Sequence, residues 1–172
     1  MNAIELFEFP DFKGDPCFID HDFTDLKDVP FLKKVLSLKV HRDTWIIFSE
    51  TDYKGEFSCY KAGSYSSLSG FDSKIRSVRC VKGGLDNHKI TLYEEETLGG
   101  EEVTLQVSVD SVKSHGFGKK ALSHKVVSGA WVLYSRENYE GGHMVTVAGD
   151  KVDKYDDSFK NVNSLKPVLP LQ

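Results

Sequence analysis

The chain has 172 residues, and 26 acidic against 22 basic side chains give it a formal net charge of −4 at pH 7. This balance excludes a strongly basic nucleic-acid-binding surface, because such a surface needs clustered lysine and arginine. Hydrophobic residues make up 40% of the chain, enough for two compact cores, yet no run of about 20 apolar residues could cross a bilayer as a helix.

The cysteines and the first residues indicate the compartment. Three cysteines, Cys17, Cys59 and Cys80, are too few and odd in number for a secreted disulfide framework. Residues 1–5 lack the basic and apolar regions of an export signal. We therefore expect free thiols and a cytoplasmic location, with release by an unconventional route left open.

One pattern recurs four times along the chain: an aromatic residue, four residues, a ring or leucine, one residue and a glycine. The copies are Phe7, Phe12, Gly14; Phe48, Tyr53, Gly55; Tyr93, Leu98, Gly100; and Tyr134, Tyr139, Gly141. The glycines lie 41, 45 and 41 residues apart (55−14, 100−55, 141−100), and both first-half glycines recur 86 residues later (100−14, 141−55). A period near 40 predicts a structural repeat. We interpret each copy as a folded hairpin, with φ > 0 at the glycine and the aromatic ring covering the turn.

A serine follows each glycine at a nearly constant distance of 23, 22, 23 and 23 residues (37−14, 77−55, 123−100, 164−141). A basic residue stands two places after every one of these serines, in segments whose alternation predicts the last strand of each repeat. We expect the hydroxyl to cap the backbone of the folded hairpin and not to act in catalysis. The four serines are Ser37, Ser77, Ser123 and Ser164.

Each repeat is expected to supply four antiparallel strands, and two repeats are expected to close one sandwich. In the first repeat the predicted strands are Ile4–Phe9, Cys17–Phe18, Asp28–Pro30 and Val35–Val40. The glycine-rich, polar stretch after residue 82 is typical of a linker. We therefore predict a first domain over residues 1–82, a linker over 83–87, a second domain over 88–168 and a tail over 169–172.

The hairpin pattern, the serines and the paired repeats resemble the βγ-crystallin superfamily over nearly the whole chain. Trp45 and Trp131, 86 residues apart (131−45), match the tryptophans of that family's second and fourth motifs. Residues 70–77, GFDSKIRS, resemble the second-motif strand entry. The resemblance implies an all-β fold of two domains, each a β-sandwich of two Greek key motifs, with a structural function and no enzymatic one.

Among family members the chain is similar to the non-lens, epidermis differentiation-specific type of amphibians and fishes. In that type, tandem domains precede an aerolysin-like pore-forming region, so the chain could be the N-terminal part of a larger protein. The alternative is a stand-alone lens structural protein, which the excess of lysine over arginine and the two tryptophans disfavour.

The resemblance also implies that the two domains pair through an apolar patch from their even-numbered repeats. The matching positions are all apolar or thiol: Ile46, Cys59 and Val81 in the first domain, and Val132, Val145 and Val168 in the second. The patch could close within one chain, giving a monomer with paired domains, or between two chains, giving a domain-swapped dimer. It could also bind a different protein.

The resemblance implies calcium as a ligand, bound through the motif N/D-N/D-x-x-S/T-S. The hydroxyl slot of that motif holds Leu36, Arg76, Leu122 and Asn163, so no repeat keeps a serine or threonine there. What is left is a degenerate site of Asp72 with the carbonyls of Lys74 and Glu8, which we expect to bind calcium at millimolar strength or weaker. The prediction is that no cofactor is required, with weak calcium binding as the alternative function.

Enzymatic patterns are missing from the sequence. The six histidines show no zinc-ligand spacing, and the cysteines form no Cys-x2-Cys pair. There is no Gly-x-Ser-x-Gly nucleophile elbow, and the paired glycines belong to a linker and to hairpins, not to a phosphate-binding loop. We predict a non-enzymatic protein.

Overall fold

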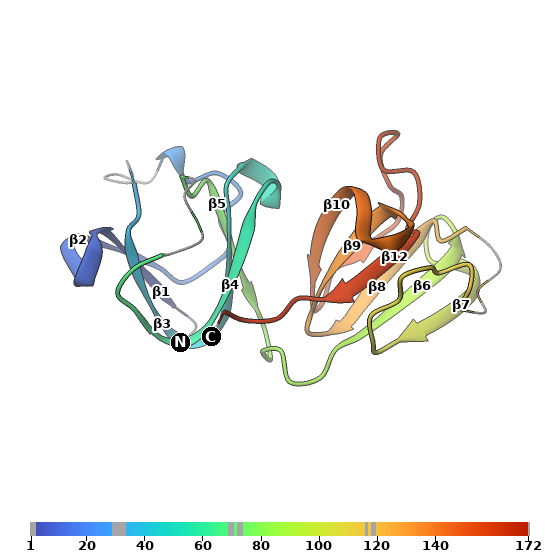
Figure 1. Cartoon of the computed structure of the whole chain (residues 1–172), viewed down its shortest axis with the longest axis horizontal. Coiled ribbons are helices and arrows are strands. Elements are labelled where there is room, and N and C mark those ends of the chain that lie inside the picture. Colours follow the sequence, from blue (N-terminus) through green and yellow to red (C-terminus); the bar gives the residue numbers. More distant parts are fainter. Residues whose placement is uncertain are drawn as a thin grey trace. The chain divides into compact units, whose positions relative to one another are not determined.

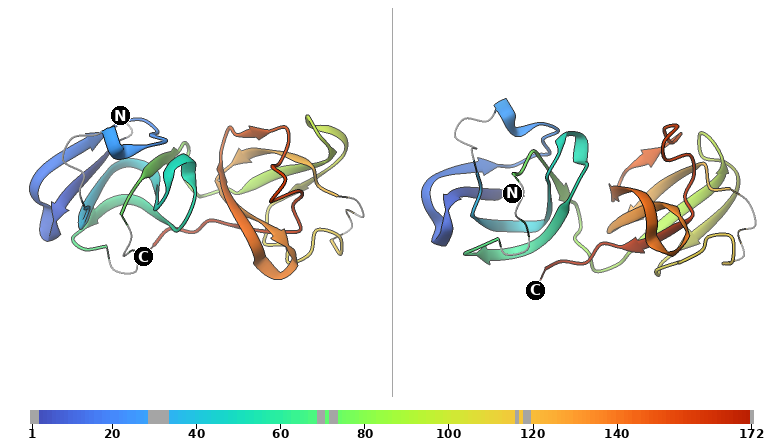
Figure 2. Two further views of the ribbon diagram at one scale, coloured as in Figure 1. Left: turned by 90° about the horizontal axis from the view of Figure 1, so that it is seen from above. Right: turned by 45° about the horizontal axis from the view of Figure 1, so that its top comes forward.

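The computed structural model describes residues 3–28, 34–68, 71, 74–115, 117 and 120–171, and strands dominate it (Figure 1). The chain divides into two compact units: residues 1–82 together with 169–172, here called domain 1, and residues 83–168, here called domain 2. Figure 2 shows that strands make up most of both units. The core cluster of each unit contains one tryptophan. The predicted all-β fold is confirmed.

Domain 1 contains a five-stranded sheet in the order β2-β1-β3-β4, with β5 also pairing with β3. Its pairings are all antiparallel. The strands are β1 (Ile4–Phe9), β2 (Lys13–Ile19), β3 (Ser37–Phe48), β4 (Phe57–Tyr65) and β5 (Ser77–Val81). Short 3-10 turns lie at Pro10–Phe12 (η1), Leu26–Asp28 (η2) and Thr51–Tyr53 (η3).

The strand β3 belongs to both repeats of domain 1. Its first part, from Ser37 to Val40, pairs with β1, and its second part, from Thr44 to Phe48, pairs with β5. Between the two parts the pairing with β4 shifts register, and Asp43 has the left-handed φ of 61°. The last strand of the first repeat therefore turns directly into the first strand of the second.

The predicted strands of the first repeat agree with the structure only in part. The bounds of β1 are those predicted, whereas β2 is longer than the Cys17–Phe18 prediction, and β3 begins at Ser37 and not at Val35. The strand predicted over Asp28–Pro30 is wrong at Asp28, which ends the η2 turn, and residues 29 and 30 lie outside the described residues. Phe23 instead bridges to Val78 through two backbone hydrogen bonds of 3.0 Å.

Domain 2 has two separate sheets. One has the order β11-β8-β6-β7 and the other β10-β9-β12. The strands are β6 (Lys89–Glu95), β7 (Gly99–Leu105), β8 (Ser123–Ser128), β9 (Ala130–Arg136), β10 (Glu140–Val147), β11 (Lys151–Val152) and β12 (Ser164–Pro167), with the 3-10 turn η4 at Glu137–Tyr139.

The two repeats of domain 2 exchange one edge segment each. The strand β11, which follows β10 in the fourth repeat, pairs with β8 of the third. In return, Val109 of the third repeat bridges to Leu165 in β12 of the fourth. This exchange is the Greek key connection, and it makes each sheet depend on both repeats.

The last residues of the chain are grouped with domain 1. Leu171 donates its backbone N–H to the carbonyl of Cys59 in β4 over 2.9 Å. Leu171 therefore contacts β4, a strand in the first half of the sequence.

Candidate functional site

The four folded hairpins are the most regular feature of the molecule. The repeated glycines have φ of +89°, +81°, +74° and +82°, the positive values expected from the sequence. The residues three and two places before each glycine also have positive φ, which was not predicted from the sequence. These pairs are Asp11 and Phe12, Asp52 and Tyr53, Thr97 and Leu98, and Asn138 and Tyr139. The signal was present, because three of the four leading residues are Asp or Asn, which tolerate this conformation.

Each repeated serine holds one hairpin at two points. Its Oγ accepts a hydrogen bond from the backbone N–H of Phe12, Tyr53, Leu98 or Tyr139, at 2.9 to 3.1 Å. The same Oγ donates at 2.6 Å to the carbonyl of Phe9, Glu50, Glu95 or Arg136. All four serines are fully buried, so their hydroxyls are unavailable as nucleophiles and the capping contacts expected from the sequence are present.

The basic residue after each serine has a physical explanation in three hairpins. Two aromatic rings meet there with centroids 5.7 to 5.8 Å apart. The cation lies over the second ring: Lys39 Nζ is 4.6 Å from the Phe12 centroid, Arg79 Cζ is 4.5 Å from Tyr53 and Lys166 Nζ is 5.0 Å from Tyr139. Such cation–π contacts stabilise the hairpin from outside. The third hairpin has Leu98 in place of the second ring.

The residues of the predicted apolar patch are all buried but lie outside the core clusters of their own domains. In domain 1, Ile46 is opposite Cys59 in the β3–β4 ladder, while Trp45 and Ile47 on either side of Ile46 belong to the core. In domain 2, Val132 is opposite Val145 in the same way. Val81 and Val168 are likewise outside the core clusters of their domains. The pairing of the two sets stays a prediction.

The predicted calcium position in domain 1 is described only in part. Glu8 and Lys74 are among the described residues, but Asp72 is not. Arg76 occupies the position where the calcium motif has a serine or threonine. Its guanidinium lies 3.7 Å from Asp25 Oδ1, so a cation with its own partner replaces the hydroxyl ligand. In the described part of the chain, no three His, Cys, Asp or Glu side chains are grouped to hold a metal ion.

The corresponding slot of domain 2 holds an amide. Asn163 Nδ2 donates to the carbonyl of Ser135 over 2.6 Å and to Asn161 Oδ1 over 2.7 Å. These two oxygens are the kind that calcium uses. Because the amide N–H groups already occupy them, they are not free to bind a cation without losing both hydrogen bonds.

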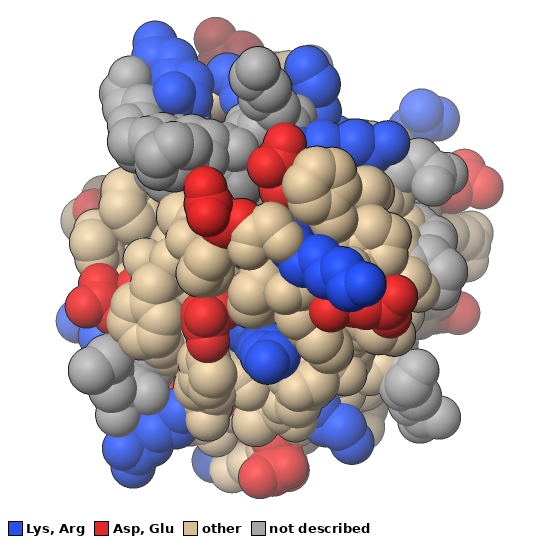
Figure 3. Space-filling view, turned by 90° about the vertical axis from the view of Figure 1, so that its left-hand side faces the viewer, with Lys and Arg blue, Asp and Glu red and all other residues tan. Residues whose placement is uncertain are grey.

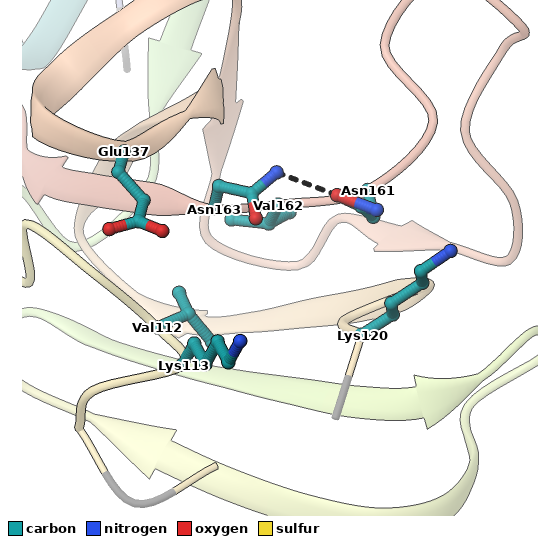
Figure 4. A pocket seen from close by; sticks show the side chains of 7 residues that line it. All are labelled: Val112, Lys113, Lys120, Glu137, Asn161, Val162 and Asn163. Carbon is teal, nitrogen blue, oxygen red and sulfur yellow. Dashed lines mark hydrogen bonds between the residues drawn. The ribbon is translucent and has the colours of Figure 1, made fainter. Parts of the chain in front are cut away.

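A hollow of about 480 Å³ lies beside this amide in domain 2 (Figure 4). Residues from separate loops line it, and their charges are of both signs: Val112, Lys113, Lys120, Glu137, Asn161, Val162 and Asn163. Among the described residues that line it there is no serine, threonine, cysteine or histidine. This hollow could not be predicted from the sequence, because its residues come from segments that only the fold brings together.

All three cysteines are free, and the two buried ones are unsuited to nucleophilic chemistry. Burial raises the pKa of Cys59 to about 12 and is also the main reason that the pKa of Cys80 rises to about 12. A thiol must ionise to react, so both stay protonated and inert at neutral pH.

Charges of both signs are interspersed on the face of domain 1 shown in Figure 3. That face shows no continuous basic stripe of the kind that follows a phosphate backbone. In the part of the chain that the structure describes, no helix has the length and apolar character needed to span a membrane.

Paired Greek key repeats with serine-capped, glycine-dependent hairpins define a tandem β-sandwich protein of the crystallin type. The sequence profile of the family Beta/Gamma crystallin matches residues 3–81 and 89–168. The chain belongs to this family.

Two relatives in sequence agree with this assignment. Over 161 residues the chain is 30% identical to Beta-crystallin B2 of Aquarana catesbeiana, covering 90% of this chain and 78% of that protein. It is 29% identical over 145 residues to Beta/gamma crystallin domain-containing protein 2 of Homo sapiens, covering 82% of this chain but only 8% of the human protein. A solved beta gamma crystallin from Ciona intestinalis has 27% identity over 45% of this chain and 98% of its own, with a TM-score of 0.43.

Proposed function

We propose that the protein is a non-enzymatic structural or interaction module that acts by folding stably and associating through the outer faces of its even-numbered repeats. The observation that carries this proposal is that the serine repeated four times is buried and bonded on both sides to hairpin backbone. The repeated chemistry of this chain therefore serves its fold.

The association surface is the patch of Ile46, Cys59 and Val81 with Val132, Val145 and Val168. These side chains are apolar or thiol and lie outside the core clusters of their own domains. In the structure at most 6% of the surface of each of these residues is exposed, and apolar surface kept from water contributes about 25 cal/mol per Å². A cover from the other domain, from a second chain or from a partner protein would each provide this stabilisation.

The test is a charge placed in the patch, Ile46→Asp and separately Val132→Asp, with Val127→Asp on a half-exposed site of β8 as the matched control. We expect either a larger radius of gyration in small-angle scattering, if the patch closes within a chain, or loss of a dimer in sedimentation. The control is expected to change neither. If both patch variants sediment and scatter like the parent protein, this association surface is wrong.

We also propose that the protein is of the non-lens, epidermal type and is the N-terminal module of a longer, pore-forming-type chain. Support comes from the human relative, of which the matching region is only 8%, so such modules occur within long proteins. Sequencing the natural transcript beyond the codon for Gln172 tests this proposal, and antibody staining of skin and lens tests the tissue. A lens-restricted protein of two domains would favour the structural alternative.

We propose that no cofactor is required and that the protein works in the cytoplasm, where its three thiols stay reduced. Weak calcium binding at Glu8, Asp72 and Lys74 is the alternative function. Calorimetric titration with calcium is expected to give no saturable heat below millimolar concentration. Tight binding would instead make the protein a calcium sensor or buffer.

A further inference from the structure

Domain 2 has a polar side chain in the middle of its apolar interior. His124 on β8 has no exposed surface. Its Nδ1 lies 2.5 Å from the Tyr155 hydroxyl, and its Nε2 lies 3.0 Å from Thr146 Oγ1. Thr146 Oγ1 is in turn 3.0 Å from Asp150 Oδ2. The four side chains form one continuous line of hydrogen bonds.

The direction of this line is fixed by its last member. An ionised carboxylate only accepts hydrogen bonds, so the Thr146 hydroxyl donates its single proton to Asp150. Thr146 Oγ1 must then accept from His124, which places a proton on Nε2. The opposite nitrogen, Nδ1, is therefore unprotonated and accepts from the Tyr155 hydroxyl. The neutral ring is held as one tautomer.

A second proton on this ring is costly in the folded domain. It would have to bind Nδ1, to which the Tyr155 O–H donates, so the hydroxyl would have to turn to accept and its own proton would lose its buried acceptor. The surroundings are apolar: the cross-strand neighbours are Leu92 on β6 and Val152 on β11. Among the described residues, Asp150 is the charged group that acts on the ring, and Tyr155 is the titratable group in contact with it. Burial lowers the pKa of His124 to about 4, although Asp150 acts in the opposite direction.

Domain 1 lacks this arrangement. The residue 86 places before His124 is Leu38, which is fully buried in the core of domain 1. The position of Thr146, opposite Trp131, is taken by Tyr60, opposite Trp45. The described histidines of domain 1, His21 and His41, are exposed and lie beside the carboxylates of Asp20 and Glu5.

We propose that His124 makes domain 2 an acid-sensitive element, in which proton uptake by the ring breaks its contact with Tyr155 and frees the segment 150–163 from the core while domain 1 stays folded. Tyr155 and Phe159 of this segment both belong to the core cluster, and their rings lie 5.2 Å apart. The Tyr155 ring also stacks on His124 at 5.6 Å. Releasing the segment would expose the apolar interior of domain 2.

The sign and the pH window follow from the two states of the ring. An unfolded histidine takes up its proton near pH 6.5, whereas the native ring resists until about pH 4. The stability of domain 2 is therefore complete above pH 6.5, falls as the pH drops toward 4 and stays reduced below that. From this group alone, we expect the unfolding equilibrium constant to rise roughly 100-fold between pH 7 and pH 4.

The first measurement needs no variant. Nitrogen-15 NMR of the histidine rings at pH 7 is expected to show His124 with its proton on Nε2 and an unprotonated Nδ1. During acidification, the indole N–H signal of Trp131 in domain 2 is expected to disappear at a higher pH than that of Trp45 in domain 1. A His124 ring that titrates near pH 6.5 while domain 2 stays folded would overturn the proposal.

A variant separates the histidine from general acid effects. In the double variant His124→Leu with Tyr155→Phe, the titrating ring is replaced by leucine, the residue found at the corresponding position of domain 1. The Tyr155 hydroxyl, which would lose its acceptor, is removed as well. We expect this double variant to lose most of the 100-fold change. The control is His88→Gln, because burial also lowers the pKa of His88 in the same domain. If the double variant unfolds with the same pH dependence as the parent and His88→Gln does not, His88 is the sensor and His124 is not.

Discussion

The two domains share a backbone frame, meaning the glycine-dependent hairpins and the serines that cap them, but they differ in the side chains that fill their interiors. The second-repeat glycine Gly55 has φ +81°, and its counterpart Gly141 has φ +82°. Inside, however, a leucine in domain 1 corresponds to His124 in domain 2. The hairpins depend on local backbone conformation and on one serine each, so the interior can change its chemistry without changing the fold. Properties that distinguish the domains should therefore come from the interior, while damage to the frame should affect both alike.

The turn between the two repeats of each domain has the same positive φ but a different residue in each domain. Asp43 in domain 1 has φ 61°, and Gly129, 86 residues later, has φ 77°. At Gly129 an added Cβ would lie 2.6 Å from His88 Cδ2. Aspartate tolerates the left-handed conformation, but only glycine also fits against that ring. The residue at this position is therefore determined both by the positive φ and by the space left beside its backbone.

The largest loss of stability is expected from replacing the hairpin glycines by alanine, and it should be equal in the two domains. In Gly55→Ala and Gly141→Ala, the new Cβ would lie 2.3 Å from Ser49 Oγ and from Ser135 Oγ respectively. Each of these hydroxyls accepts a backbone N–H, so it cannot move away without losing that bond. We expect each change to reduce the free energy of unfolding of its domain by about 2 kcal/mol or more, measured in urea with the two tryptophan indole signals.

The control for this pair is Gly149→Ala in domain 2. Gly149 has φ +95°, but an added Cβ there would meet nothing within 4 Å. We expect it to lose only the conformational part, about 1 kcal/mol. Equal losses at Gly141 and Gly149 would mean that the close approach to Ser135 contributes nothing.

A somewhat smaller loss is expected from the serines. Ser77→Ala leaves the Tyr53 N–H and the Glu50 carbonyl without their shared partner, and Ser164→Ala does the same to Tyr139 and Arg136. Leaving such groups unsatisfied costs about 1–3 kcal/mol, so we expect about 2 kcal/mol in each domain by the same urea measurement. Ser64→Ala, at an exposed site in β4, is the control and should change stability by less than about 0.5 kcal/mol. A loss in only one domain would show that the frame is not shared.

The frame could be predicted from the sequence because its requirements are local. A glycine that must adopt positive φ and a serine at fixed distance leave a periodic signal along the chain. The strand near Asp28 was misplaced because it depends on pairing across the domain, which Phe23 makes with Val78. The line from His124 to Asp150 was missed for the same reason, since its members lie 4 to 31 residues apart. Comparing the two halves would have flagged a histidine aligned with a leucine.

The third hairpin offers the smallest effect and the sharpest comparison, because threonine takes the place that Asp or Asn holds in the other three. Thr97 has φ 59°, where the other hairpins place Asp11, Asp52 and Asn138 at 57° to 58°. A β-branched side chain is strained in this conformation, whereas asparagine tolerates it. Thr97→Asn should therefore stabilise domain 2 by about 0.5–1 kcal/mol, seen as a higher urea midpoint for the Trp131 signal.

The reciprocal change in the same domain is Asn138→Thr. Both residues are exposed, and each donates its backbone N–H over 2.8 Å, Thr97 to the Asp153 carbonyl and Asn138 to the Asp110 carbonyl. Neither substitution removes that bond, so the two differ only in which hairpin carries the branched side chain. Asn138→Thr should destabilise domain 2 by about as much as Thr97→Asn stabilises it, and the double exchange should restore the parent midpoint. If Thr97→Asn leaves the midpoint unchanged or lowers it, the third hairpin accommodates its threonine without strain, and the difference among the four hairpins has no energetic consequence.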